Sequence, residues 1–133
     1  MNKWKCLFKT ENGGVFPAKW GSRPAGIKRA AEASGYVFIC IGLGKVGSKA
    51  DILTEIAGAL KYPSYFGMNW DALSDALTDL SWNRARGYVI MITGFRTLSE
   101  KMTAEVVMLQ KIFESSAGYW NQHSVPFFVI ISE

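Results

Sequence analysis

Three aspartates spaced four residues apart are the groups in this sequence that are best placed to do chemistry. They are Asp71, Asp75 and Asp79. No Lys or Arg occurs between Lys61 and Arg84, although the chain of 133 residues contains 15 Lys and Arg residues. Carboxylates without neighbouring bases can attract a cationic partner, or two of them can act as an acid–base pair in catalysis. A solvated row of charges that binds nothing is the third possibility.

A helix from Asn69 to about Asp79 is needed to hold these carboxylates on one face. Asn69 is a natural N-cap for it. Apolar residues recur at three- and four-residue steps, which predicts a second, buried stripe made of Trp70, Leu73, Ala76, Leu77 and Leu80. Like charges four residues apart on a helix repel each other by about 0.2–0.5 kcal/mol per pair. The sequence therefore presents the aspartates in spite of a small loss of stability.

Three apolar runs predict the sheet behind this helix. The runs Tyr36–Ile41, Tyr88–Thr93 and Pro126–Ser132 are rich in β-branched and aromatic residues, which is typical of strands covered on both faces. Helical patterns separate them, and strands that alternate with helices favour a parallel sheet. The predicted fold class is α/β, with a small three-stranded parallel sheet packed by helices and an N-terminal segment that can extend the sheet.

Capping and breaking residues predict where the other elements begin and end. Ser48 can cap a helix over 49–60, which Pro63 would end, and Gly35 can end a helix over 25–34. A third helical pattern over 98–116 contains a break near Thr103. The remaining expectations are a short strand over 4–9, turns at 11–14 and 83–87, and a loop over 118–125.

Other sites that could carry chemistry are weakly supported. The loop Gly42–Gly47 spells G-x-G-x-x-G between a strand and a helix, which is the pattern of a dinucleotide-binding site, but no acidic residue follows at the end of a second strand. His123 is the single His and falls in a predicted loop. Cys6 and Cys40 have no metal-binding spacing, and they are either buried free thiols or one disulfide. We therefore expect no catalytic residue, no metal and no cofactor.

The charge is divided unevenly along the chain, whose formal net charge is +4. Residues 1–61 hold ten basic and four acidic residues, whereas residues 62–133 hold five basic and seven acidic ones. A basic half that binds nucleic acid through Lys3, Lys5, Lys28 and Arg29 is the alternative to a function of the acidic helix. No apolar stretch has the length of a signal peptide or a membrane span, so we expect a cytoplasmic protein.

The segment Tyr62–Leu80 (YPSYFGMNWDALSDALTDL) resembles the signature of the barstar family, small protein inhibitors of secreted ribonucleases. The predicted order of strands and helices from Tyr36 onward is also similar to that family. The resemblance implies that residues 1–35 are an extension within the same domain as a barstar-like region over 36–133. It also implies a protein that is not an enzyme, needs no cofactor, is a monomer when free and binds a ribonuclease.

The resemblance assigns roles to individual residues of this chain. Asp75 would be the main anchor in the phosphate-binding pocket of the ribonuclease, and Asp71 would pair with another cationic group there. Tyr65 would pack on the partner, and Gly67 would allow the turn before the helix. The other residues implied to contact the partner are Asn69, Ser74, Thr78 and Glu114.

Overall fold

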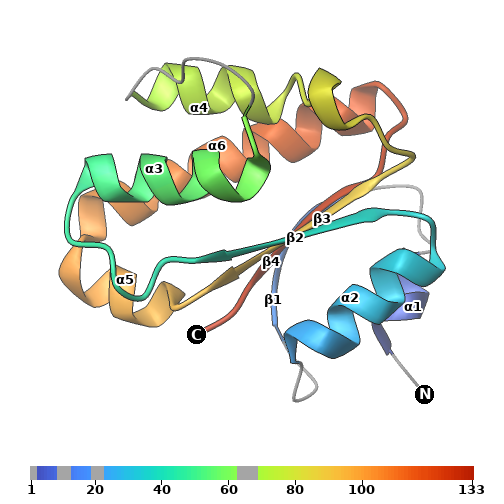
Figure 1. Ribbon diagram of the computed structural model, residues 1–133, viewed down its shortest axis with the longest axis horizontal. Helices are drawn as coiled ribbons and strands as arrows, with labels where there is room; N and C mark the ends of the chain where they lie inside the picture. Colours follow the sequence, from blue (N-terminus) through green and yellow to red (C-terminus); the bar gives the residue numbers. More distant parts are fainter. Residues whose placement is uncertain (1–2, 9–12, 19–22, 63–68) are drawn as a thin grey trace.

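A parallel sheet of four strands forms the middle layer of the fold. The computed structural model describes residues 3–8, 13–18, 23–62 and 69–133. The elements in chain order are α1 (Lys3–Phe8), β1 (Gly14–Pro17), α2 (Pro24–Ala33), β2 (Val37–Gly42), α3 (Lys49–Leu60), α4 (Trp70–Leu77), the 3₁₀ helix η1 (Ser81–Asn83), β3 (Tyr88–Thr93), α5 (Phe95–Lys101), α6 (Thr103–Gln122) and β4 (Phe127–Ile131). The strand order is β1-β4-β3-β2, and every pair is parallel (Figure 1).

The three strands predicted from apolar runs are present as β2, β3 and β4, but the predicted total of three was wrong. Residues 14–17 add a fourth strand beside β4, in the register Gly14↔Phe128 to Pro17↔Ile131. The pairing continues past the strand, where Ala18 N donates to Ile131 O at 2.7 Å. Only Val15 and Phe16 of its four residues favour a strand, so the segment is too short to be predicted from its sequence, and pairing with the free edge of β4 decides its conformation.

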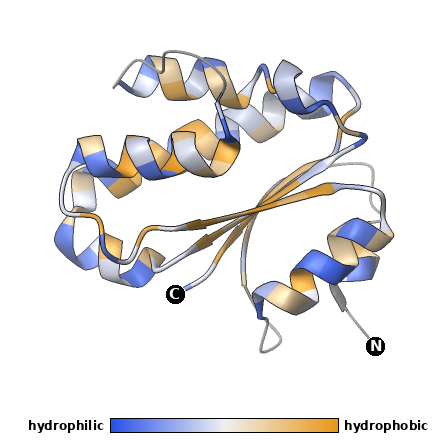
Figure 2. Cartoon of the chain, viewed as in Figure 1, coloured by the Kyte–Doolittle hydropathy of each residue, from blue (hydrophilic) through white to orange (hydrophobic). Residues whose placement is uncertain are grey.

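Side chains alternate along the strands and form two hydrophobic cores, one on each face of the sheet. Ile39, Ile90 and Val129 belong to the core beneath α3, α4, α5 and α6. Val89 and Phe128 belong to the core beneath α1 and α2. Figure 1 shows the two groups of helices on opposite faces, and in Figure 2 the strands between them are strongly hydrophobic. The layers are those expected for strands buried on both faces.

Capping residues behave as the sequence predicts. Ser48 Oγ accepts a hydrogen bond from Asp51 N at 3.1 Å at the start of α3, and α3 spans the predicted residues 49–60. Lys61 then adopts a left-handed conformation with φ of 55°, while Pro63 lies outside the described residues. Met102 separates α5 from α6, which confirms the predicted break near Thr103. None of the described helices is long and apolar enough to cross a membrane.

Two local predictions were wrong, one near each end of the chain. Residues 3–8 form a helix rather than a strand, since Trp4 and Phe8 lie one turn apart and both are buried. The Phe8 ring packs on Phe128 at 4.9 Å between centroids, and Tyr36 Oη donates to Phe8 O at 2.8 Å. Residues 118–122 continue α6 rather than form a loop, and the side chain of Asn121 accepts from Gly13 N at 2.9 Å.

Candidate functional site

The helix α4 begins where the sequence predicts and buries the predicted stripe. Asn69 is extended at the N-cap, and its Oδ1 accepts from Ala72 N at 2.8 Å. Trp70 is half-buried, with Lys49 Nζ 5.2 Å from the centre of its ring. The rest of the stripe is buried and consists of Leu73, Ala76, Leu77 and Leu80. One face of α4 is thereby fixed to the core, so the opposite face is held outward.

Asp71, Asp75 and Asp79, here called the acidic row, are all exposed. Among the residues that the structure describes, none of the three forms an ion pair; the ion pair that is present joins Arg96 and Glu133 at 3.4 Å, on other elements. The one hydrogen bond to the row that these residues supply comes from Ser81 Oγ to Asp79 Oδ2, at 3.2 Å. The row therefore presents negative charge that no described base neutralises in an ion pair.

The other residues that the resemblance assigned to the site lie around this row in different ways. Ser74 and Thr78 are half-buried, and Thr78 Oγ1 donates to Ser74 O at 2.8 Å. Glu114 is exposed on α6, the helix that packs against α4. Tyr65 and Gly67 fall within residues 63–68, outside the described residues. The helix ends at Leu77 rather than near Asp79, so the structure brings Asn69, the row, Ser74 and Thr78 together on α4 and the residues just beyond its two ends, and adds Glu114 from α6.

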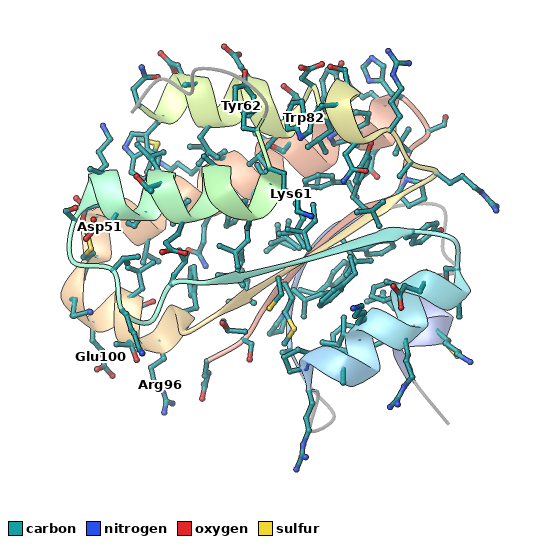
Figure 3. All side chains as sticks on the ribbon, viewed as in Figure 1. Asp51, Lys61, Tyr62, Trp82, Arg96 and Glu100 are labelled. Carbon is teal, nitrogen blue, oxygen red and sulfur yellow. The ribbon has the colours of Figure 1, made fainter. Side chains whose placement is uncertain are left out.

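Two indole groups hold the elements around the acidic row in place. Trp120 Nε1 donates to Leu77 O at 2.8 Å, which satisfies a carbonyl at the end of α4 that has no partner within the helix. Trp82 Nε1 donates to Leu60 O at 2.8 Å and does the same for the end of α3. The rings of Trp82 and Tyr62 meet edge to face at 4.8 Å, beside the end of α3 in Figure 3. Trp120 lies 43 residues from Leu77 in the sequence, so the pattern of the acidic helix alone did not reveal this contact.

A hollow of about 290 Å³ adjoins the last carboxylate of the row. Tyr88 forms its floor: Tyr88 Oη donates to Asn83 O at 2.9 Å and accepts from Ala85 N at 3.1 Å. Burial raises the pKa of Tyr88, while the Ala85 N–H and the charge of Arg84 act in the opposite direction. The residues that line the hollow are Asp79, Leu80, Ser81, Arg84, Ala85, Tyr88 and Trp120.

The glycine-rich loop after β2 packs closely against the residues that follow β3. Gly94 has φ of 75°, and a Cβ built on it would lie 2.5 Å from Gly44 N, so two loops approach backbone to backbone there. A small hollow beside the loop is lined by two carboxylates, Asp51 and Glu55, and by one basic residue, Lys45, so its formal charge is negative. Two carboxylates repel phosphate, which disfavours the nucleotide-binding alternative. The described residues also contain no group of His, Cys, Asp and Glu able to hold a metal ion.

The basic residues of the N-terminal half lie mainly away from the acidic row. Lys5, Lys28 and Arg29 are exposed on α1 and α2. Those two helices cover the face of the sheet opposite to α4 (Figure 1). Cys6 and Cys40 are free thiols rather than a disulfide. Both are exposed, although buried thiols were expected. The sheet thus separates a basic side from an acidic helix.

The chain is similar to a known protein family and to solved structures. The family model described as Barstar (barnase inhibitor) matches residues 36–132. A search of curated proteins found no match. Among solved structures, the chain is similar to the structure of the Aeropyrum pernix ORC2 protein in ADPNP-ADP complexes, with 12% identity and a TM-score of 0.57. That match covers 98% of this chain and 40% of the other, and at such identity it shows the fold alone.

Proposed function

Because the chain belongs to the barstar family, we propose that it is a protein inhibitor of a ribonuclease. In this proposal the acidic row of α4 enters the basic RNA-binding cleft of the enzyme and occupies the place of the RNA phosphates. The chain acts by binding and carries out no catalysis. It serves as a cytoplasmic immunity protein, or antitoxin, that protects a cell from the nuclease.

The observation that carries the proposal is the unneutralised acidic row on an anchored helix. A cleft that binds RNA presents cationic groups to phosphates, so a rigid row of carboxylates complements it. The long-range attraction between row and cleft speeds encounter, and the charge pairs that are buried on docking slow release. The indole hydrogen bond to Leu77 O and the Asn69 cap hold α4 before the partner arrives, which lowers the entropy lost on binding.

The roles of individual residues form part of this proposal. Asp75, near the middle of the row, is the main anchor, and Asp71 pairs with a second cationic group. Glu114 contributes an accessory carboxylate from α6. Further contacts come from Tyr65, Gly67, Asn69, Ser74 and Thr78. Residues 1–35 extend the domain formed with residues 36–133, because β1 belongs to the same sheet.

Stoichiometric inhibition is the experiment that tests the proposal. The chain is titrated into barnase and into a panel of other small, basic, secreted ribonucleases while RNA cleavage is followed. We expect at least one enzyme to lose activity linearly to an end point of one inhibitor per enzyme. A variant with Asp71→Asn, Asp75→Asn and Asp79→Asn should lose this inhibition. If the saturating wild-type chain inhibits none of the enzymes, the proposed function is wrong.

Nucleic-acid binding by the N-terminal half is the second candidate, favoured by the exposed Lys5, Lys28 and Arg29. It predicts a salt-dependent gel shift with RNA or DNA that the double variant Lys28→Glu, Arg29→Glu abolishes. If the wild-type chain produces no shift at low salt, this candidate is removed. The two candidates use opposite sides of the sheet, so each set of variants leaves the other surface intact.

A further inference from the structure

The strand β2 forms an open edge of the sheet, because it pairs with β3 on one side only. Val37 N donates to Gly87 O at 3.0 Å, and Leu43 N donates to Thr93 O at 2.9 Å. In a parallel pair every second residue directs both its N–H and its C=O to the neighbouring strand. The N–H and C=O groups of Phe38, Cys40 and Gly42 therefore point away from β3. No hydrogen bond from another described element reaches them.

The usual means of protecting such an edge are missing from β2. Natural edges are blocked by charged side chains, proline, bulges, very short strands or a covering segment. β2 has six residues, VFICIG, with no charge and no proline, and its register with β3 runs unbroken from Val37↔Tyr88 to Gly42↔Thr93. In Figure 1 no described element crosses in front of it. The strand at the other edge, β1, has four residues and ends in Pro17.

We propose that β2 pairs with β2 of a second copy of this chain, in an antiparallel ladder about a two-fold axis at Cys40. In this register Cys40 faces Cys40 of the second copy, and Phe38 faces Gly42 of the second copy. Each of the three opposed pairs exchanges two N–H···O bonds. The ladder thus contains six hydrogen bonds and satisfies every outward N–H and C=O of these residues. A two-fold axis makes the same patch serve both copies.

The side chains along the edge favour a second copy over an unrelated strand. Phe38, Cys40 and Gly42 share one face of the sheet, where Phe38 is half-buried and the other two are exposed. The two-fold register places a phenyl ring opposite a glycine at both ends, an arrangement in which the ring covers backbone that glycine leaves bare. Residues 36–44 carry no charge, so the strands meet without direct repulsion in a chain of net charge +4.

The ladder and the acidic row occupy different parts of the molecule. α4 packs against α6, whereas α2 and α3 are the helices that contact β2. A dimer formed through β2 therefore uses none of the residues proposed to bind a ribonuclease. One ladder of six hydrogen bonds is a small interface, so we expect a weak dimer with a dissociation constant between about 1 μM and about 1 mM.

The chain's two cysteines provide a matched test by chemical cross-linking. Cys6→Ser leaves Cys40 as the sole thiol, and Cys40→Ser leaves Cys6. In the proposed ladder the two Cys40 Cα atoms lie about 5.5 Å apart, within reach of a short bismaleimide. Cys6 is exposed on α1, which packs beneath β4, two strands in from this edge. We expect covalent dimers from the chain that retains Cys40 and none from the chain that retains Cys6. Equal yields, or no dimer from either chain, would overturn the proposal.

Sedimentation of backbone and charge variants gives a second, independent readout. Cys40→Pro deletes an N–H that has no partner in the monomer, and Cys40→Ala is its matched control. Cys40→Lys places two ammonium groups against each other at the two-fold axis and keeps the N–H. We expect the wild-type and Cys40→Ala chains to dimerise alike, and the Pro and Lys variants to dimerise at least tenfold more weakly. A wild-type chain that stays monomeric up to about 1 mM, or a folded Lys variant that dimerises like wild type, would refute it.

Discussion

Asp75→Asn should make the free protein more stable, because the acidic row repels itself. Asp75 lies four residues from Asp71 on α4, so its neutralisation removes one repulsive helical pair worth about 0.2–0.5 kcal/mol, whereas Asp79 lies beyond the last helical residue, Leu77. It also lies in the last turn of α4, where a negative charge opposes the helix dipole by about 0.3–1 kcal/mol. No described base pairs with it, so nothing offsets these gains. We expect the free energy of unfolding to rise by about 0.5–1.5 kcal/mol.

Urea denaturation followed by tryptophan fluorescence measures this change. With a slope of about 2 kcal/mol per M, the midpoint should move up by roughly 0.5 M at low ionic strength, and by less at high salt. Asp51→Asn is a control that should change the free energy of unfolding in the opposite direction, since Asp51 lies in the first turn of α3 and accepts from Gly47 N at 3.0 Å. That variant should lose stability. If Asp75→Asn lowers the midpoint, the row is not self-repelling and the reasoning fails.

Two further predictions concern the supports of the site. Asn69→Ala should lower the free energy of unfolding by about 1 kcal/mol through loss of the cap, and Ser48→Ala should do the same for α3. Since Asn69 alone caps α4, only its variant should also increase hydrogen exchange in α4; equal exchange in both would contradict this. Burial raises the pKa of Tyr88 above its usual 10.0, so the folded state holds this proton more tightly than the unfolded state. The free energy of unfolding should therefore fall as the pH rises from about 10 through the pKa of Tyr88 in the folded state. Urea midpoints measured from pH 8 to 11 should show this fall for the wild-type chain and a smaller fall for Tyr88→Phe. If the midpoints of both chains fall equally with pH, Tyr88 is not the cause of the fall.

Local chemistry and periodicity were enough to predict the elements nearest the site. The caps at Ser48 and Asn69 depend on side chains bonding the first turn of their own helices, and a sequence shows such neighbours directly. The buried stripe of α4 follows from spacing, and so do the strands β2, β3 and β4. The signature over 62–80 then led to the family that the match over residues 36–132 shows.

The parts that could not be predicted depend on contacts between residues distant in sequence. β1 is a strand because β4 has a free edge beside it, and α6 continues through Gly118 to Trp120, whose indole bonds Leu77 O 43 residues away. The wrong prediction of a strand for α1 has a different origin, because the four-residue spacing of Trp4 and Phe8 is a helical signal within the segment itself. The order of the strands, which leaves β2 at an edge, cannot be predicted from any single segment of the sequence. The family resemblance implied a monomer, whereas the open edge of β2 leads us to propose a weak dimer.

The central claim is that Asp75 anchors the acidic row in a ribonuclease cleft. Calorimetric titration of a ribonuclease that the wild-type chain inhibits, with Asp75→Ala and Glu100→Ala, tests it most directly. Both changes remove one exposed carboxylate, but Glu100 lies on α5, far from the Tyr62 and Trp82 side of the molecule (Figure 3). We predict that Asp75→Ala raises the dissociation constant by about 30-fold or more, because it leaves a buried cation unpaired, while Glu100→Ala changes it by less than about threefold. Equal effects of the two variants, or an unchanged constant for Asp75→Ala, would contradict the account.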